Sequence, residues 1–356
     1  MRFFAPLLLP SLALLGCGSP AATPQTPTQE SAVQAPPPPV PTASPPPTSP
    51  LDVREWGLID VYSDGQIELA AGPGSAASRP ATHPARPTPR PPMPMRKPVV
   101  YFHLDPNVPS LDVRVEVHIA GAMIETWPTP TSQTGVDHIV WQGTVTQCPP
   151  GAQSAANDSA VQAARAHCQT SDHICEVADL PTYETSDGAC VNVGAQAARL
   201  LFYRGELAQG TSFPIAVTPA ATIALSTALE HPVFFVRDGA GSVHDAQVGE
   251  LSFSTATGGQ EPNLPRADTL IEPFTAELIR AGLSADEARA FMAAWSDSLF
   301  GNQATRGIGR RGVAPPESTL LYFLPRADIE RLAPMTVQPT PRSLERVMVV
   351  RQYIAL

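Results

Sequence analysis

The chain has 356 residues, with 23 Lys and Arg against 33 Asp and Glu, so its formal net charge is −10. An acidic chain lacks the basic surface that holds phosphate backbones, which argues against nucleic acid as a partner. Many of the 42 prolines gather in residues 18–50 and 72–97. Residues 51–356 are enough for one large domain or two modest ones.

Residues 1–16 have the pattern of a secretory signal peptide. Arg2 precedes an apolar run that ends at Leu15, and this run is shorter than the roughly 20 residues that cross a bilayer. It continues into Gly16-Cys17, and the whole resembles the lipobox of bacterial lipoproteins. The resemblance implies cleavage after Gly16 and diacylation of Cys17, which anchors a chain stably. The alternative is an ordinary signal peptide that is cleaved nearby.

The residue after the cysteine is Gly18, not the Asp that retains lipoproteins at the inner membrane in enteric bacteria. We therefore expect a lipid anchor in the outer membrane, with the protein on its periplasmic or surface face. Residues 17–50 form a Pro-rich tether, because Pro, Thr, Ser, Ala and Gln cannot build a core. In polyproline II conformation this tether reaches up to about 100 Å from the membrane.

Residues 51–264 predict a β-rich domain. The clearest strand covers 111–119, where Leu and Val alternate with charged residues, so one face is buried and the other is wet. Similar short runs follow, separated by turn residues. They predict a mainly β fold, an antiparallel sandwich or barrel-like arrangement. Residues 72–97 predict a basic Pro-rich loop that contains Arg79, Arg96 and Lys97 and is mostly solvated.

The cysteines other than Cys17 all lie within residues 146–190, which form a polar insertion. An even number of cysteines in an oxidising compartment predicts two disulfides, although the sequence does not choose among the three pairings. A zinc site is the alternative, but the spacing contains no C-x-x-C pair. The candidates for disulfide bonds are Cys148, Cys168, Cys175 and Cys190.

Residues 265–356 predict two helices and closing strands that pack on the β domain. Pro273 suits a first helical turn, and Gly282 ends that helix. Ser284 and Glu287 have the spacing of a capping box for the second helix. Its buried stripe is predicted to contain Ala288, Phe291, Met292, Trp295 and Leu299.

Five short blocks resemble a family of uncharacterised envelope proteins from myxobacteria and planctomycetes: KPVVYFH, IETWPTP, LLFYRGEL, LLYFLPR and RVMVVRQ. The resemblance covers roughly residues 53–356 and implies a common fold and a secreted location. It implies no activity and no catalytic residue, because none is established for that family.

Few motifs point to chemistry. His103, Asp105 and His118 lie on polar strand faces and could hold zinc together with Glu116 and His138, if their strands are neighbours. Gly307–Gly312 matches G-x-G-x-x-G but follows a helix and leads into a strand, the reverse of a dinucleotide loop. The loop could instead hold an anion through Arg306, Arg310 and Arg311.

Two Glu–Trp combinations suggest a sugar-binding surface, because ring faces stack on sugars and carboxylates bind their hydroxyls. They are Glu55 with Trp56, and Glu125 with Trp127. Tryptophan in a strand is also typical of core packing. We expect a lipid-anchored envelope protein with a non-catalytic binding or structural role, whose partner is an envelope protein or polysaccharide. The alternatives are a metal-dependent hydrolase of envelope or extracellular polymer and a carbohydrate or peptide recognition module.

Overall fold

The structure is a computed structural model that describes most of the chain after Thr48. The described residues are 49–62, 93–148, 158–159, 161–162, 177–208, 210–217, 223–237, 240–244, 249–251, 265–300 and 318–354. They belong to one unit, Pro47–Leu356. The signal peptide, the lipidation residue Cys17 and nearly all of the tether lie outside the described residues, as does the anion loop with Arg306, Arg310 and Arg311.

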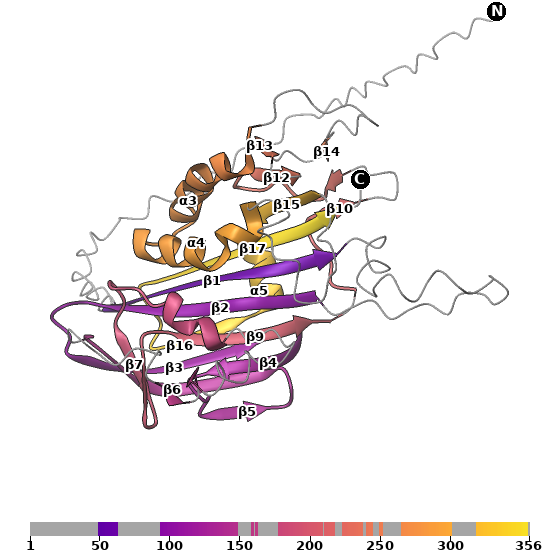
Figure 1. The fold of residues 1–356 in the computed structure, drawn as a ribbon. Coiled ribbons are helices and arrows are strands. Elements are labelled where there is room, and N and C mark those ends of the chain that lie inside the picture. Colours follow the sequence, from indigo (N-terminus) through magenta and orange to yellow (C-terminus); the bar gives the residue numbers. More distant parts are fainter. Residues whose placement is uncertain are drawn as a thin grey trace, which may run out of the picture. The chain divides into compact units, whose positions relative to one another are not determined.

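The largest sheet has eight strands, and Figure 1 shows its long central strands running side by side. Its centre is the pair formed by β1 (Leu51–Tyr62) and β17 (Ser343–Ile354), which are parallel although they lie at opposite ends of the described chain. The order is β13-β12-β15-β17-β1-β2-β9-β4. The other six strands are β2 (Met93–Leu104), β4 (Gly121–Trp127), β9 (Leu201–Leu207), β12 (Val233–Arg237), β13 (Ala240–His244) and β15 (Ser318–Phe323).

The central strands are buried on both faces. Every residue of β15 is buried, as is every residue from Val347 to Ile354 in β17. Strands covered on both sides read as continuous apolar runs rather than as alternating ones, which explains the sequences of β15 and β17. The helices cover one face of the sheet, where Trp56 of β1 meets Phe291 with ring centroids 5.3 Å apart.

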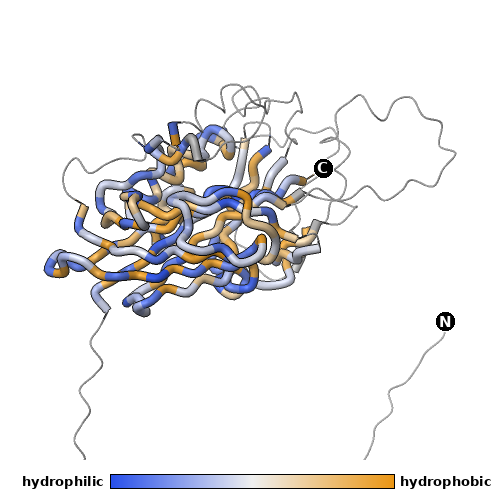
Figure 2. Tube along the Cα trace, turned by 90° about the horizontal axis from the view of Figure 1, so that it is seen from below, coloured by the Kyte–Doolittle hydropathy of each residue, from blue (hydrophilic) through white to orange (hydrophobic). Residues whose placement is uncertain are grey.

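The second sheet has six strands and one solvent-facing side. Its order is β16-β3-β6-β7-β8, with β5 paired to β6. In β3, Val113, Val115 and Val117 are buried and the residues between them are not, which confirms the predicted alternation. Figure 2 shows apolar and polar positions alternating along such strands. The bounds are β3 (Ser110–His118), β5 (Ser132–Thr134), β6 (His138–Thr146), β7 (Cys190–Val193), β8 (Gln196–Ala198) and β16 (Met335–Gln338).

A third sheet has three short antiparallel strands, β10 (Ile215–Val217), β11 (Ile223–Leu225) and β14 (Gly249–Leu251). Two short 3-10 helices are also present: η2 (Val177–Thr182) precedes β7, and η3 (Ala267–Leu270) precedes the next helix. The helix α5 (Arg326–Leu332) connects β15 to β16. None of the helices in the described residues combines the length and the apolar character that crossing a membrane requires.

The two predicted helices are confirmed as α3 (Ile271–Arg280) and α4 (Ala285–Phe300). Gly282 lies between them with φ of +115°, a conformation that favours glycine. The capping box is present, because the Glu287 N–H donates to Ser284 Oγ at 3.2 Å and the Ser284 N–H donates to Glu287 Oε2 at 2.7 Å. All five residues of the predicted stripe are buried.

The fold class is therefore confirmed: mainly β, with C-terminal helices and a disulfide in the middle of the chain. The arrangement differs from a purely antiparallel one, because β1 and β17 are parallel. Strands from both sides of residue 265 also share one sheet, since β17 lies between β15 and β1. Residues 51–264 and 265–356 thus contribute to a common core.

Candidate functional site

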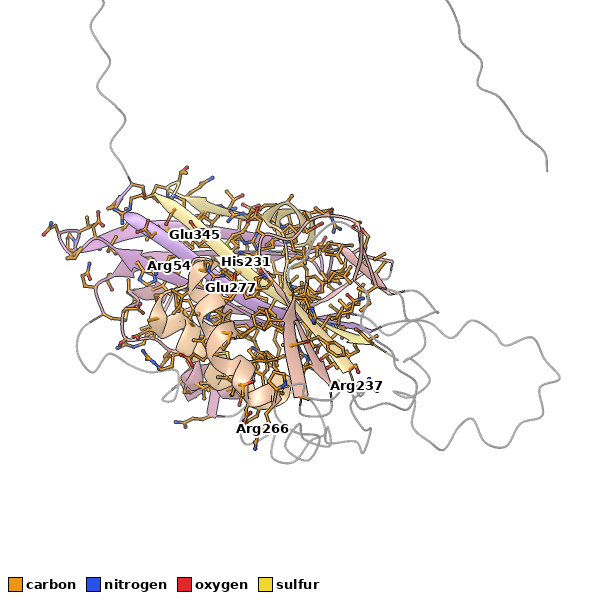
Figure 3. The ribbon with its side chains drawn as sticks, turned by 90° about the horizontal axis from the view of Figure 1, so that it is seen from above. Arg54, His231, Arg237, Arg266, Glu277 and Glu345 are labelled. Atoms are coloured by element: carbon orange, nitrogen blue, oxygen red, sulfur yellow. A yellow bond between two sulfur atoms is a disulfide. The ribbon has the colours of Figure 1, made fainter. Side chains whose placement is uncertain are left out.

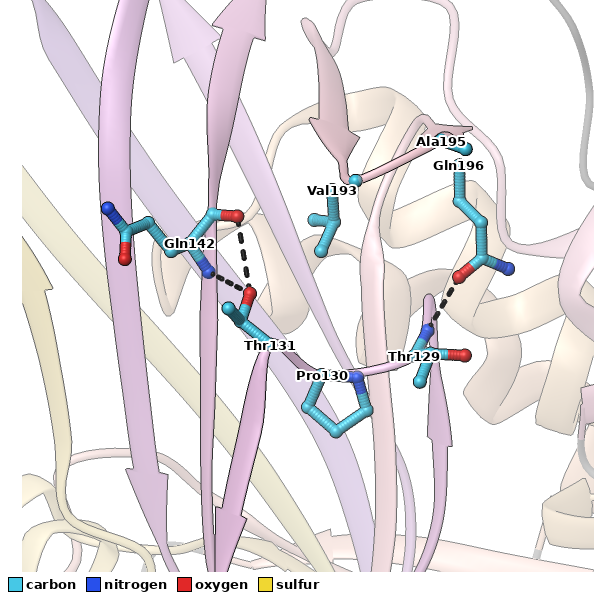
Figure 4. Close-up of a pocket in the computed structure, with 8 residues that line it drawn as sticks. Thr129, Pro130, Thr131, Gln142, Val193, Ala195 and Gln196 are labelled. Carbon is cyan, nitrogen blue, oxygen red and sulfur yellow. Dashed lines mark hydrogen bonds between the residues drawn. The ribbon is translucent and has the colours of Figure 1, made fainter.

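An open hollow with a volume of about 560 Å³ lies beside β6, and Figure 4 shows the residues that line it. One edge of β6 is paired with β5 at Val140 and again with β7 at Thr144. Between these two positions the edge has no partner strand among the described residues. The loop from Thr129 to Thr131 and the turn between β7 and β8 form the walls of the hollow.

Hydrogen bonds hold these walls in place (Figure 4). Thr131 Oγ1 accepts the Gln142 N–H at 2.8 Å and donates to the Gln142 carbonyl at 3.3 Å. A side chain thus replaces the missing strand at the edge of β6, where unpaired backbone groups would otherwise need water. Gln196 Oε1 accepts the Thr129 N–H at 2.9 Å, which fixes the other end of the loop. The hollow is therefore formed before any ligand arrives.

The lining consists entirely of uncharged groups. Figure 4 shows the Gln142 side chain extending away from Thr131, Val193 and Gln196, so Gln142 contributes its backbone to the lining. Pro130, Val193 and Ala195 provide apolar surface, and the threonines, Gln196 and the backbone of the β7–β8 turn provide hydrogen-bonding groups. Such groups donate to and accept from hydroxyls and amides. They do not titrate near neutral pH, so the hollow is suited to binding rather than to acid–base catalysis.

The predicted tryptophan surface is wrong. Trp56 and Trp127 are both buried, so neither ring face is available to a sugar. Their neighbouring carboxylates are also engaged, because Glu55 accepts from Arg346 at 2.6 Å and Glu125 accepts from Arg204 at 3.1 Å. The tryptophans are core residues, since a large apolar ring gains most when it is removed from water.

The predicted group of His103, Asp105 and His118 is not brought together. His103 of β2 is 2.8 Å from Glu287 of α4, whereas Asp105 accepts from Arg342 at 3.1 Å. His118 lies in the other sheet, on β3. In the described parts of the chain, no three His, Cys, Asp or Glu side chains are grouped to hold a metal ion. The zinc prediction required the strands of His103 and His118 to be neighbours, but β2 and β3 belong to different sheets.

Two buried glutamates fasten the α3–α4 hairpin to the rest of the molecule. Glu287 is bonded to His103, and Glu277 of α3 is bonded to His231 Nδ1 at 2.5 Å (Figure 3). Burial of a carboxylate is costly unless it is paired, and an arginine also lies beside each glutamate: Arg54 is 3.7 Å from Glu287, and Arg280 forms an ion pair with Glu277. Sequence reasoning identified Glu287 only as a capping residue and missed Glu277. The signal available was an acid inside an otherwise apolar helical stripe.

The C-terminal boundary predicted for the basic loop is wrong. Residues 93–97 belong to β2, and Lys97 is buried rather than solvated. Its Nζ lies 4.4 Å from the centroid of the Trp295 ring and 4.9 Å from that of Tyr183. Arg96 is also engaged, at 2.9 Å from the buried Asp60. The rest of the predicted loop lies outside the described residues.

The sheet contains two buried ion pairs formed by facing residues of β1 and β17. Arg346 donates to Glu55, which also accepts from the Tyr203 hydroxyl at 2.6 Å. Arg351 donates to Asp60 at 2.6 Å and 3.0 Å. Burial alone raises the pKa of the Asp60 carboxyl, but the charges of Arg351 and Arg96 outweigh it, so this pKa is below its usual value. Burial and the charge of Glu55 hold the pKa of Tyr203 well above its usual value.

One predicted disulfide is present, between Cys148 and Cys190. It joins the end of β6 to the start of β7, next to the paired residues Thr146 and Cys190. Cys168 and Cys175 lie outside the described residues, so the second disulfide stays a prediction.

Comparisons with protein-family models, curated proteins and solved structures find no match to this chain. The resemblance to the myxobacterial and planctomycete envelope proteins therefore stays a prediction.

Proposed function

We propose that this protein is a lipid-anchored binding protein of the cell envelope, with a non-catalytic role. Its N-terminal sequence supports the anchor, because a short apolar run leads directly to Cys17. The Pro-rich tether supports display at a distance from the membrane. The outer membrane is the proposed location, with an envelope polysaccharide as the partner.

The observation that carries the binding role is the hollow beside β6. Its volume of about 560 Å³ is within the range of small-ligand sites, and its uncharged lining combines apolar surface with a few hydrogen-bonding groups. A neutral sugar presents both apolar ring surface and hydroxyls, so it can contact both parts of this lining. We therefore propose neutral sugar units of an envelope polysaccharide as the ligand. A metal-dependent hydrolase would need His103, Asp105 and His118 to converge on one ion, but each of them bonds to a different partner.

The binding role is tested with neutral oligosaccharides of N-acetylglucosamine, added to the mature chain in detergent and followed by saturation-transfer NMR. Ala195→Trp places a large ring in the hollow from an exposed position of the β7–β8 turn, so it should weaken binding at least tenfold without unfolding the protein. Ala197→Trp is the matched control, because Ala197 is also exposed but does not line the hollow. Equal binding by all three proteins would contradict the proposed site.

The anchor is tested separately by Cys17→Ala. The wild type should incorporate radioactive palmitate and sediment with outer membranes, whereas the variant should do neither. A variant that keeps both properties would remove Cys17 as the lipidation site. The outcome does not depend on the sugar experiment, so each part of the proposal can fail by itself.

A further inference from the structure

His118 and His138 lie directly opposite each other on the solvent-facing side of the six-stranded sheet. They are paired in the register of β3 and β6. The backbone N–H of His118 points away from β6 and donates to the Pro334 carbonyl at 3.0 Å. The two histidines therefore form a non-hydrogen-bonded pair of the β3–β6 ladder. Side chains in such pairs are closer together than in the hydrogen-bonded kind. Their ring centroids are 6.0 Å apart.

Each imidazole is held by its own carboxylate. His118 Nε2 is 2.5 Å from Asp137 Oδ2, and His138 Nε2 is 2.8 Å from Glu116 Oε1. Arg114 donates to the other oxygen of Glu116 at 3.1 Å and so orients it.

These contacts determine which ring nitrogen carries the hydrogen. An ionised carboxylate only accepts hydrogen bonds, so the Nε2 atom that faces it must be the donor. In a neutral imidazole the other nitrogen, Nδ1, then has a free lone pair. Among the described residues, neither Nδ1 atom has a hydrogen-bond partner. The pair therefore presents two lone pairs to solvent from adjacent strands.

We propose that His118 and His138 form a two-histidine chelate for a divalent transition-metal ion, with Nδ1 of each ring as the ligand and water in the remaining positions. Asp137 and Glu116 complete the arrangement, because metal-binding histidines almost always give their other ring N–H to a carboxylate or similar acceptor.

The spacing of the rings is consistent with a shared ion. With metal–nitrogen bonds of about 2 Å, two imidazoles have ring centroids about 5 Å apart on a tetrahedral ion and about 4.5 Å apart in neighbouring positions of a square-planar one. The observed 6.0 Å therefore requires the two rings to approach by about 1 to 1.5 Å. Imidazole ligands suit Cu²⁺, Ni²⁺ and Zn²⁺, and Cu²⁺ is expected to bind most tightly. The site uses no residue of the hollow and does not depend on the proposed function.

The test is titration of the untagged mature chain with Cu²⁺, followed by calorimetry and by electron paramagnetic resonance. The wild type should bind one ion at this site, with a spectrum showing two nitrogen ligands. His118→Gln and His138→Gln should each weaken this binding at least tenfold. His244→Gln, in a different sheet, should change the affinity by less than twofold. Asp137→Asn should weaken binding by about tenfold, because the acceptor that orients the ring is lost.

A second measurement keeps the test decisive if a variant fails to fold. Wild-type protein is treated with diethylpyrocarbonate with and without Cu²⁺, and the modified histidines are identified by peptide mass spectrometry. The ion should protect His118 and His138 together, while His244 is modified equally in both samples. Equal modification of the pair with and without Cu²⁺, or unchanged binding by the two glutamine variants, would overturn the proposal.

Discussion

Lys97 illustrates how surroundings determine what a residue contributes. It is the only lysine of the chain, and it lies in β2 with φ of +50°. The pairing of β2 shifts register here on both sides, so Lys97 and Pro98 form a β-bulge. A non-glycine residue at positive φ is strained. The contacts of its ammonium group with Trp295 and Tyr183 offset that strain.

We expect Lys97→Met to lower the free energy of unfolding by about 2 kcal/mol, because it removes the charge from both aromatic rings and keeps most of the buried chain. Urea unfolding measures this value. Asp179→Asn is the control for the ion pair at 3.4 Å and should cost about 0.5 kcal/mol or less, since Asp179 is 57% exposed. Equal losses in the two variants would mean that the ion pair, not the rings, stabilises Lys97.

The buried Asp60 gives a dependence on pH. Its folded-state pKa is lowered from the usual 3.8. A carboxyl with a lowered pKa stabilises the fold above its unfolded value, and this stabilisation is lost as pH falls toward the folded value. The free energy of unfolding should therefore decrease as pH falls below about 4. Asp60→Asn should be less stable at pH 7 and should lose less stability on acidification, as measured by urea unfolding at both pH values.

At the scale of elements, α4 is the clearest success of sequence reasoning. A capping box, a following apolar stripe and a glycine before the helix are local signals, and all of them are present in the structure. The partner of Glu287 could not be predicted in the same way. His103 is 184 positions away in the sequence, and only the packing of α4 on the large sheet brings it within 2.8 Å.

Ser284→Ala should lower the free energy of unfolding by about 1 kcal/mol, because the Glu287 N–H loses its capping oxygen. Ser298→Ala in the same helix should change it by less than about 0.5 kcal/mol, since among the described residues its hydroxyl bonds only to the Trp295 carbonyl within the helix. Chemical unfolding of both variants provides the measurement. Similar values for both would show that the cap contributes no more than an ordinary helical serine.

The disulfide between Cys148 and Cys190 narrows the cysteine pairing. Elimination leaves Cys168 and Cys175 as the second pair. Non-reducing peptide mapping of the exported protein should find both bridges and no free thiol. Cys168→Ser should then expose one thiol, at Cys175, and should leave the other bridge intact. A bridge between either of these residues and Cys148 would contradict the pairing.

At the scale of the whole molecule, the large sheet depends on contacts between distant parts of the chain. β1 and β17 are paired over eleven positions, from Asp52–Ser343 to Tyr62–Tyr353. Their facing residues include both buried ion pairs, Glu55 with Arg346 and Asp60 with Arg351. The other strand provides the main counter-charge for each of these buried groups, and Arg96 of β2 adds a second one for Asp60.

A chain that ends at Arg342 should therefore fail to fold. It would lack β17, which leaves Glu55 and Asp60 without their main partners and separates β1 from β15. Circular dichroism and limited proteolysis of the exported protein would show this directly. A chain that ends at Ile354 is the control and should resist the protease like the wild type. A folded product from the shorter chain would mean that β1 does not need β17.

The sequence by itself determined the features that depend on local patterns: the alternation of β3, the continuous apolar strands, the two C-terminal helices with the cap of α4, the mainly β class and the cysteines of the insertion. These follow from side-chain period, capping groups and glycine conformation, which act within a few residues. The tertiary structure alone decided the parallel pairing of β1 with β17, the burial of Lys97, the hollow beside β6 and the meeting of His118 with His138. Each of these brings together residues whose separation in the chain carries no local signal, so packing had to place them.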